Sequence, residues 1–355
     1  MNITSVIIIC FLYSYSLILL YITYLAKRNR DKGAFINNAA NSIVLIFSIT
    51  INLFLIHIIK PLSTQFVAFP FDVLLLCFIL LYVPLYSLLV LKEKKKVSKG
   101  KDSFEEISPR TKYLPLKYDI YRKLTHFVVL GIIFFYFTLG FLIQNFFIYI
   151  LDFLPDFFNT IFDLGGDLMI FTQNLVIFLV GASLIGLLTA DFTRILIPKY
   201  YPLKVVNQIL KKKELHMRLG PHISMSIGCF SIILLYGLIQ PIGPIIICSS
   251  MVMAVFGDTA SNLIGRLIGK NQIRNTNKTY EGLFAGIIVA FITGFIVLLL
   301  LQNFYLPENL GLFFLPLLGA VIIGLIDYFD LEIDDNLSYI FILSTVLFFS
   351  TLLLF

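Results

Sequence analysis

Residues 282–301 read Gly-Leu-Phe-Ala-Gly-Ile-Ile-Val-Ala-Phe-Ile-Thr-Gly-Phe-Ile-Val-Leu-Leu-Leu-Leu and contain no charged side chain. At about 1.5 Å per residue, a helix of roughly 20 apolar residues crosses the hydrocarbon core of a bilayer. A helix also satisfies its own backbone hydrogen bonds, which lipid cannot do. This stretch therefore predicts a transmembrane helix.

Similar apolar segments recur along all 355 residues. Hydrophobic residues make up 59% of the chain and charged residues 14%, whereas soluble domains have about 45–50% and about 25%. This composition excludes a soluble enzyme, a disordered regulator and a nucleic-acid reader with a charged face. Ten segments are long enough to be membrane helices: 3–25, 41–59, 71–91, 124–150, 168–190, 219–239, 242–257, 281–301, 311–326 and 337–355. We predict an all-α, polytopic integral membrane protein with about ten transmembrane helices.

The basic residues divide unequally between the predicted loops. Of 27 lysines and arginines, all but Lys60 lie in the loops after the first, third, fifth and seventh segments. The connection at 151–167 carries aspartates and no basic residue. Cytoplasmic loops accumulate Lys and Arg, so the odd-numbered loops are predicted to be cytoplasmic and both termini to lie outside. The net charge of +6 is then a basic collar facing lipid headgroups, and no nucleic-acid partner is expected.

A polar run precedes the opening stretch. Residues 257–270 read Gly-Asp-Thr-Ala-Ser-Asn-Leu-Ile-Gly-Arg-Leu-Ile-Gly-Lys. At helical spacing, one face carries a carboxylate, an amide and two glycines beside two basic residues: Asp258, Asn262, Gly265, Gly269, Arg266 and Lys270. Oxygen ligands suit a divalent cation, basic groups suit phosphate, and glycine leaves the backbone open to a ligand. The run is typical of a site for a metal-bound polyphosphate, and packing of small residues between membrane helices is the alternative.

A second polar run opens the helix quoted first. Residues 277–286 read Asn-Lys-Thr-Tyr-Glu-Gly-Leu-Phe-Ala-Gly. Lys278 and Thr279 lie at the helix N-terminus, where unpaired amides and the helix dipole favour an anion. Glu281 lies in the first turn, and Gly282 begins a face of small residues. A helix cap with packing glycines is again the alternative.

Together the two runs resemble the signature of the CTP-using membrane lipid kinases, namely dolichol kinase, phytol kinase and the yeast-type diacylglycerol kinase. The phosphatidate cytidylyltransferases share the core of that signature. Shorter matches extend over about residues 120–350: Arg122-Lys123-x-x-His126, Asp191-x-x-Arg194, Glu214 and Asp334-Asp335-Asn336-Leu337. Asp191 and Arg194, three apart on a helix, are also expected to form an ion pair.

The region 324–339 bears on which of these two groups of enzymes the chain resembles more. The cytidylyltransferases have a His-Gly-Gly…Asp-Arg-x-Asp block, and residues 324–336 contain neither histidine nor arginine. This difference favours a kinase. The chain departs from the kinases at Asp327, where they more often have glutamate, and at Tyr339, where a small residue or proline is usual.

The resemblance implies a CTP-dependent kinase that phosphorylates the hydroxyl of a membrane lipid alcohol at the cytoplasmic face. Polyprenol or dolichol, phytol or geranylgeraniol, and diacylglycerol are the implied acceptors, with Mg²⁺ as the divalent cation and CTP as co-substrate. The implied catalytic residues are Asp258, Lys278, Glu281, Asp335 and His126. The implied nucleotide-binding residues are Asn262, Gly265, Arg266, Gly269, Lys270, Thr279, Gly282, Arg122 and Lys123. The implied metal ligands are Asp258, Asp334 and Asp335.

Residues 120–355 form the predicted catalytic membrane domain of about seven helices. Residues 1–119 hold three transmembrane helices and a basic cytoplasmic loop, without a motif. A CDP-lipid synthase similar to phosphatidate cytidylyltransferase is one alternative function, and a small-solute transporter is another. A transporter favours inverted repeats and charges at mid-membrane, whereas these charges lie at predicted helix ends. The charge rule fits a cell membrane and an endoplasmic reticulum membrane equally, and the oligomeric state stays open.

Overall fold

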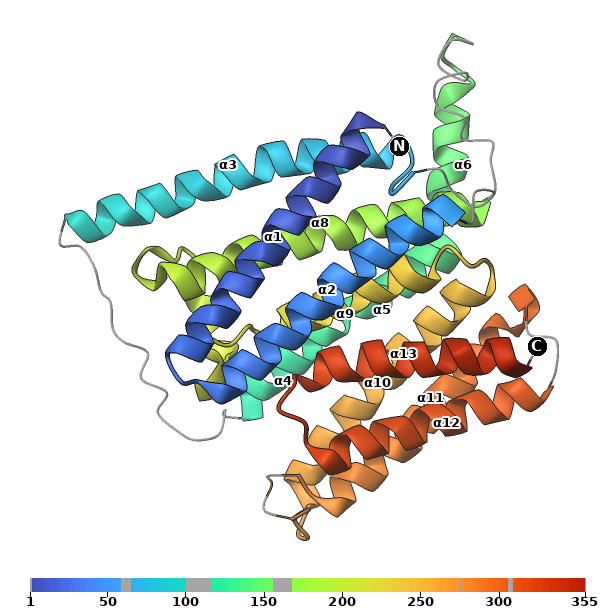
Figure 1. The fold of residues 1–355 in the computed structure, drawn as a ribbon. Coiled ribbons are helices and arrows are strands. Elements are labelled where there is room, and N and C mark those ends of the chain that lie inside the picture. The colour runs from blue at the N-terminus through green and yellow to red at the C-terminus, as the bar shows by residue number, and fades with distance from the viewer. Residues whose placement is uncertain are drawn as a thin grey trace.

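The computed structural model describes residues 2–58, 65–99, 116–155, 168–274, 276, 278–305 and 309–354. Over these residues the chain is helical (Figure 1), apart from loops and an isolated β-bridge between Gln272 and Thr279. The predicted positions Lys60, Asn277 and 156–167 lie outside this part. The α-helices are α1 (Ile3–Arg28), α2 (Lys32–Ile58), α3 (Phe71–Ser98), α4 (Leu116–His126), α5 (Val128–Phe134), α6 (Gly140–Leu151), α8 (Leu168–Leu196), α9 (Pro221–Tyr236), α10 (Ile242–Ile268), α11 (Tyr280–Tyr305), α12 (Asn309–Phe329) and α13 (Asp335–Leu354).

The predicted membrane segments coincide with these helices. Within the described residues, nine helical stretches are long and apolar enough to cross a membrane. One of them, residues 117–151, combines α4, α5, a π-helical turn at Phe135–Leu139 and α6. The shorter apolar helix α9 accounts for the tenth predicted segment. The prediction of an all-α, polytopic membrane protein is confirmed.

Several helices extend beyond their predicted bounds. α2 begins at Lys32 rather than residue 41, and α10 continues to Ile268 rather than 257. Hydropathy detects the apolar part of a membrane helix. The additional turns carry polar side chains such as Asn37 and Asp258, which are buried against protein rather than lipid. A helix continues where such groups find partners in neighbouring elements.

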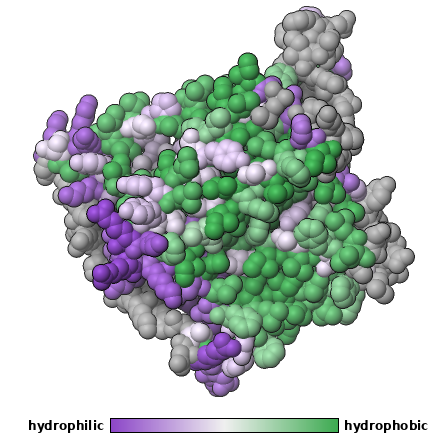
Figure 2. All heavy atoms as spheres, in the orientation of Figure 1, coloured by the Kyte–Doolittle hydropathy of each residue, from purple (hydrophilic) through white to green (hydrophobic). Residues whose placement is uncertain are grey.

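α9 and α10 form the centre of the bundle. α9 has 16 residues, so its length is about 24 Å, and almost every side chain along it is buried. It packs against α2, α8 and α13, while α10 packs against α11 and α13. Figure 2 shows apolar residues over most of the visible face and hydrophilic residues gathered along its lower left side.

The first three helices belong to the same core as the rest of the bundle. One cluster of buried apolar side chains runs from Ile8 on α1 to Phe348 on α13. α2 packs on α9, and α3 packs on α8. The predicted boundary between residues 119 and 120 falls inside α4. Buried apolar residues of both predicted parts therefore belong to one cluster.

Asparagines of α2 hold two loops at the polar end. Asn38 Nδ2 donates a hydrogen bond to the carbonyl oxygen of Met217 at 2.8 Å, and Asn38 Oδ1 accepts one from the Leu219 amide at 3.1 Å. Asn37 Oδ1 accepts one from the Asp334 amide at 2.8 Å. Both asparagines are fully buried. The N-terminal helices thereby fix the loop before α9 and the loop before α13.

Asn38→Ala tests this attachment. The substitution leaves a buried amide and a buried carbonyl unpaired, so the free energy of unfolding should fall by about 1–3 kcal/mol. SDS-induced unfolding in mixed micelles measures the change. Asn29, which is exposed at the end of α1, provides the matched control: Asn29→Ala should shift the unfolding free energy by less than about 0.5 kcal/mol. Equal effects of both substitutions would contradict the role assigned to Asn38.

Candidate active site

Asp258 lies at the centre of a charged cluster on the C-terminal half of α10. Its carboxylate accepts a hydrogen bond from Lys123 Nζ, and the Asp258 side chain is about nine-tenths buried. Asn262 Nδ2 donates to Asp258 Oδ1 at 3.2 Å. His126 Nδ1 lies 3.7 Å from Asp258 Oδ2. The structure brings together the predicted residues of the α10 run and of α4.

α4 carries a second buried acid that the motifs did not indicate. Asp119 Oδ2 lies 3.4 Å from Arg266 Nη1, and Asp119 Oδ1 lies 4.0 Å from Arg122 Nε. Arg122 Nη1 also donates to Glu214 Oε1 at 3.5 Å. Asp119, Arg122 and Glu214 are each at most 5% exposed. Arg122 and Glu214, two of the short matches to the lipid kinase signature, are therefore neighbours, and Asp119 lies beside them.

Several buried polar atoms on α4 make no hydrogen bond within the described part of the chain. They are both carboxylate oxygens of Asp119, Nε of Arg122 and Nε2 of His126. Buried polar groups without a partner cost free energy and are uncommon in folded proteins. Asp119 and Arg122 nevertheless take part in ion pairs, so Nε2 of His126 is the atom of this group with neither a hydrogen bond nor an ion pair in the described residues.

Lys278 joins a second group of acids to α10. Its Nζ lies 2.9 Å from Asp327 Oδ1, 3.1 Å from Asp335 Oδ2 and 3.3 Å from Asp330 Oδ1. Ser261 Oγ on α10 donates to Asp327 Oδ2 at 2.8 Å. The ammonium thus connects the start of α11 with the end of α12 and the start of α13.

The charge of Lys278 is stabilised by its neighbours. Burial by itself would lower the pKa of Lys278, because a low dielectric disfavours the charged form. The attraction of Asp335 and Asp327 outweighs burial, and the net pKa is raised above its ordinary value. The side chain is therefore a permanent cation at neutral pH, available to anionic oxygens of a ligand.

The glycines of the two runs have a packing role. A Cβ at Gly269 would lie 2.5 Å from Thr279 Oγ1, and one at Gly282 would lie 2.6 Å from the carbonyl oxygen of Ser261. A Cβ at Gly265 would meet Thr279 Oγ1 at 3.0 Å. Protein atoms of α11 and α10 already occupy the space beside these residues. We expected a nucleotide to approach the backbone at these glycines, but neighbouring protein atoms fill that space. The geometry fits the alternative, in which the glycines allow the helices to pack closely.

Thr279 and Glu281 stabilise the loop between α10 and α11. Thr279 Oγ1 accepts a hydrogen bond from the Gly282 amide at 3.3 Å, as a helix N-cap does. Glu281 is partly exposed, and its Oε1 accepts a hydrogen bond from Asn271 Nδ2 at 2.9 Å. Among the described residues Glu281 makes no ion pair with Lys278, whose ammonium is surrounded by Asp327, Asp330 and Asp335. Lys270 is exposed on the same loop.

Asp334 has a different environment from Asp335. Asp334 Oδ1 accepts hydrogen bonds from the amide and the side chain of Asn336, at 3.0 and 2.6 Å, and caps α13. Burial would raise the pKa of Asp334, but Arg218 and Arg122 outweigh it, and the pKa lies below its ordinary value. This carboxylate is directed to a helix end and to arginines rather than to an open metal position.

Any Mg²⁺ at this site would need phosphate oxygens to complete its coordination shell. Within the described residues, no three His, Cys, Asp or Glu side chains are placed to hold a metal ion by themselves. Magnesium at nucleotide sites is usually held by one or two carboxylates, with phosphate oxygens and water completing the shell. Asp258 and the partly exposed Asp335 are carboxylates of this kind.

The resembling pair Asp191 and Arg194 forms the expected ion pair, with Arg194 Nε 2.5 Å from Asp191 Oδ1. Arg194 also donates to the carbonyl oxygens of Glu214 and Arg218, at 2.6 and 2.8 Å. Its role is to hold the loop that places Glu214 beside Arg122. Sequence reasoning missed Asn38 and Asp119, although an asparagine beside an apolar segment and an acid near Arg122 were visible signals.

The chain matches no protein-family model, no curated protein and no solved structure.

Lys278→Met tests the charge balance around this residue. Since the folded-state pKa lies above the ordinary value of 10.5, the stabilisation from Lys278 is complete below that pH and is lost as pH rises through the folded-state pKa. Wild-type protein should therefore melt at a higher temperature than Lys278→Met between pH 7 and pH 10, and the difference should narrow above about pH 10.5.

Lys95→Met is the matched control, because Lys95 is an exposed member of a lysine run on α3. It should change the melting temperature little at any pH, since exposed charges contribute little to stability. Equal melting temperatures of wild type and Lys278→Met at neutral pH would contradict the stabilising role of the Lys278 charge. So would a difference in melting temperature that grows above about pH 10.5.

Proposed function

We propose that the protein is a CTP-dependent kinase that phosphorylates the hydroxyl of a membrane lipid alcohol. The observation that supports it most is the buried charged cluster around Asp258 and Lys278, at one end of an otherwise apolar bundle. Ionisable groups within membrane helices are costly and generally mark function. The Nε2 atom of His126, which makes no hydrogen bond within the described residues, supports binding of a polar group at the same place. The basic loops support a cytoplasmic location for this end.

Phosphoryl transfer requires positioned reactants and neutralised phosphate charge. Lys123, Arg266 and Lys278 supply cations around the cluster, and nucleotide phosphates would exchange with some of their present acidic partners. Asp258 and Asp335 would hold Mg²⁺, which when bound neutralises part of the charge on the nucleotide.

His126 is the best placed group to accept the proton of the lipid alcohol. It is 1% exposed, its Nδ1 faces Asp258, and its Nε2 has no hydrogen-bond partner in the described chain. A neutral imidazole with a free nitrogen can accept a proton on that nitrogen. The alcohol oxygen would form a bond to the terminal phosphorus, the bond from that phosphorus to the bridging oxygen would break, and CDP would leave.

The surroundings of the cluster suit an acceptor that arrives from lipid. Leu124 and Val128 lie beside the charged residues of α4, and Leu267 and Ile268 lie beside Arg266; all four are exposed apolar side chains. Phe127 and Phe256 pack edge to face and connect the two segments, with ring centroids 5.3 Å apart. An apolar lipid body could contact these residues while its hydroxyl reaches the headgroup level.

The direct test uses CTP labelled at its terminal phosphate and purified protein with Mg²⁺. Dolichol, phytol, geranylgeraniol and diacylglycerol serve as separate acceptors in mixed micelles. We expect label to pass to one class of lipid alcohol, and thin-layer chromatography of the lipid product detects it. Release of pyrophosphate from CTP and phosphatidate, with formation of a CDP-lipid, would instead identify a cytidylyltransferase. Failure to bind CTP at all would favour transport over catalysis.

Asp258→Asn tests the central residue. The substitution keeps size and shape but removes the charge required by Mg²⁺ and by Lys123, so turnover should fall by a factor on the order of 10² or more. Lys95→Met, remote in the basic collar, should retain wild-type turnover. Gel filtration and thermal unfolding check that both variants remain folded. A folded Asp258→Asn protein with near-normal turnover would show that this run serves packing alone.

A further inference from the structure

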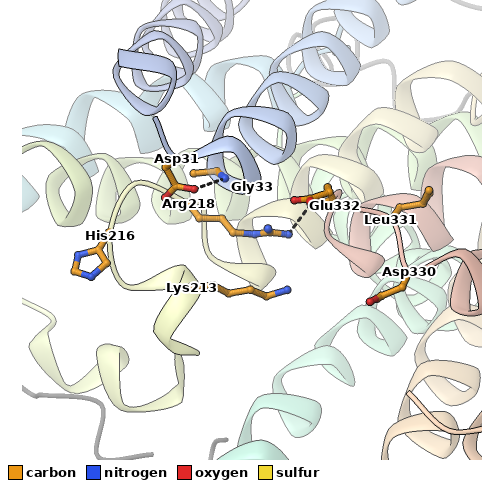
Figure 3. A pocket seen from close by; sticks show the side chains of 9 residues that line it. Asp31, Gly33, Lys213, His216, Arg218, Asp330, Leu331 and Glu332 are labelled. Atoms are coloured by element: carbon orange, nitrogen blue, oxygen red, sulfur yellow. Dashed lines mark hydrogen bonds between the residues drawn. The ribbon is translucent and has the colours of Figure 1, made fainter. Parts of the chain in front are cut away.

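A polar pocket of about 310 Å³ lies beside the charged cluster, where the turn between α1 and α2 meets two loops of the later helices. Figure 3 shows side chains from these three segments pointing into a common space. Its lining includes Asp31, Gly33, Lys213, Arg218, Asp330 and Glu332. The first three helices, which carry no motif, therefore contribute to a site.

Arg218 is the buried member of this lining. Its side chain is 4% exposed, and its Nη2 donates to the carbonyl oxygen of Glu332 at 3.0 Å. Its Nε makes no hydrogen bond within the described residues. A buried guanidinium with an unused N–H indicates a site for a hydrogen-bond acceptor.

Gly33 lies where a carboxylate and a guanidinium of the pocket lining approach the backbone of α2. A Cβ at Gly33 would lie 3.2 Å from Glu332 Oε2 and 3.5 Å from Arg218 Nη1. A carboxylate and a guanidinium thus face the same point from two sides. This combination suits a flat ligand that offers donors and acceptors side by side, and it suits a polyphosphate less, because carboxylates repel phosphate.

Asp330 links the pocket to the charged cluster. It lines the pocket, and its Oδ1 lies 3.3 Å from Lys278 Nζ. A ligand that extended from the pocket past Asp330 would bring its other end to Lys278.

We propose that this pocket binds the nucleoside end of the donor nucleotide and selects cytosine, while the phosphates lie toward Lys278. The exocyclic amino group of cytosine donates to a carboxylate, as acidic side chains accept from this group in nucleic-acid recognition. Glu332 takes that role, and Arg218 donates to the adjacent carbonyl oxygen or ring nitrogen. This inference rests on the proposed use of CTP, and it makes the turn between α1 and α2 part of the nucleotide site.

The test measures binding of radiolabelled CTP to the full chain in lipid nanodiscs, without a lipid acceptor. Gly33→Val fills the pocket, and we expect CTP to bind at least tenfold more weakly. Gly131→Val is the matched control, because a Cβ at Gly131 meets no atom within 4 Å, and it should change CTP affinity less than twofold. Tripolyphosphate competes as a probe of the phosphate end, and its affinity should be the same in Gly33→Val as in wild type.

Glu332→Gln adds a readout of specificity. Uracil presents a carbonyl oxygen where cytosine has its amino group, so an amide at position 332 can donate to it. The preference for CTP over UTP should fall at least tenfold in Glu332→Gln, whereas Glu93→Gln at the end of α3 should leave it unchanged.

Unaltered CTP affinity in Gly33→Val, or equal loss of CTP and tripolyphosphate binding, would overturn the assignment of the pocket. So would an unchanged preference for CTP over UTP in Glu332→Gln. Failure of the proposed function has a different result: wild-type protein binds CTP in this pocket but transfers no phosphate to any lipid alcohol.

Discussion

The contact between Asp258 and Lys123 is the interaction on which the polar end of this protein depends. A carboxylate in the interior of a membrane protein is costly unless a cation neutralises it, and removal of one partner leaves the other charge uncompensated. This pair therefore fixes α4 against α10. Once α4 is fixed, Arg122 meets Glu214 and Asp119 meets Arg266. Each further ion pair uses a side chain that the first contact has already placed.

The sequence was sufficient to predict the fold class and the segments, because long apolar stretches in a membrane protein have few alternatives to helix. It also indicated that positions 122–126, 258–262, 278 and 335 would belong together, and the structure places them around two adjoining charged groups. The role of Gly269 and Gly282 was not predictable from spacing, because a small residue has the same pattern whether a ligand or a helix covers it. Thr279 fills the space beside Gly269 because α11 begins next to the end of α10, and this placement is known only from the structure.

Contacts made by single polar residues were also beyond the sequence. Asn38 bonds to backbone atoms about 180 positions later in the chain, and no local pattern specifies such a partner. The same is true of Asp327 and Tyr339, the two positions that depart from the lipid kinases that the chain resembles. The Tyr339 hydroxyl donates to Asp327 Oδ1. Aspartate is one methylene shorter than glutamate, and the large phenol reaches it, so the two departures form a single contact.

The enclosure of α9 has a consequence for how the protein is made. At about 24 Å this helix is shorter than the hydrocarbon core of a typical bilayer, which is about 30 Å thick, and in the folded protein its neighbours cover it on all sides. Helices leave the ribosome in chain order, so α2 and α8 are available when α9 enters the membrane, but α13 is synthesised later. Until then one side of α9 faces lipid of unmatched thickness. Biogenesis of this bundle is therefore complete only when the C-terminal helix has inserted, and a chain truncated before α13 would present an incompletely covered helix to the quality control of the membrane.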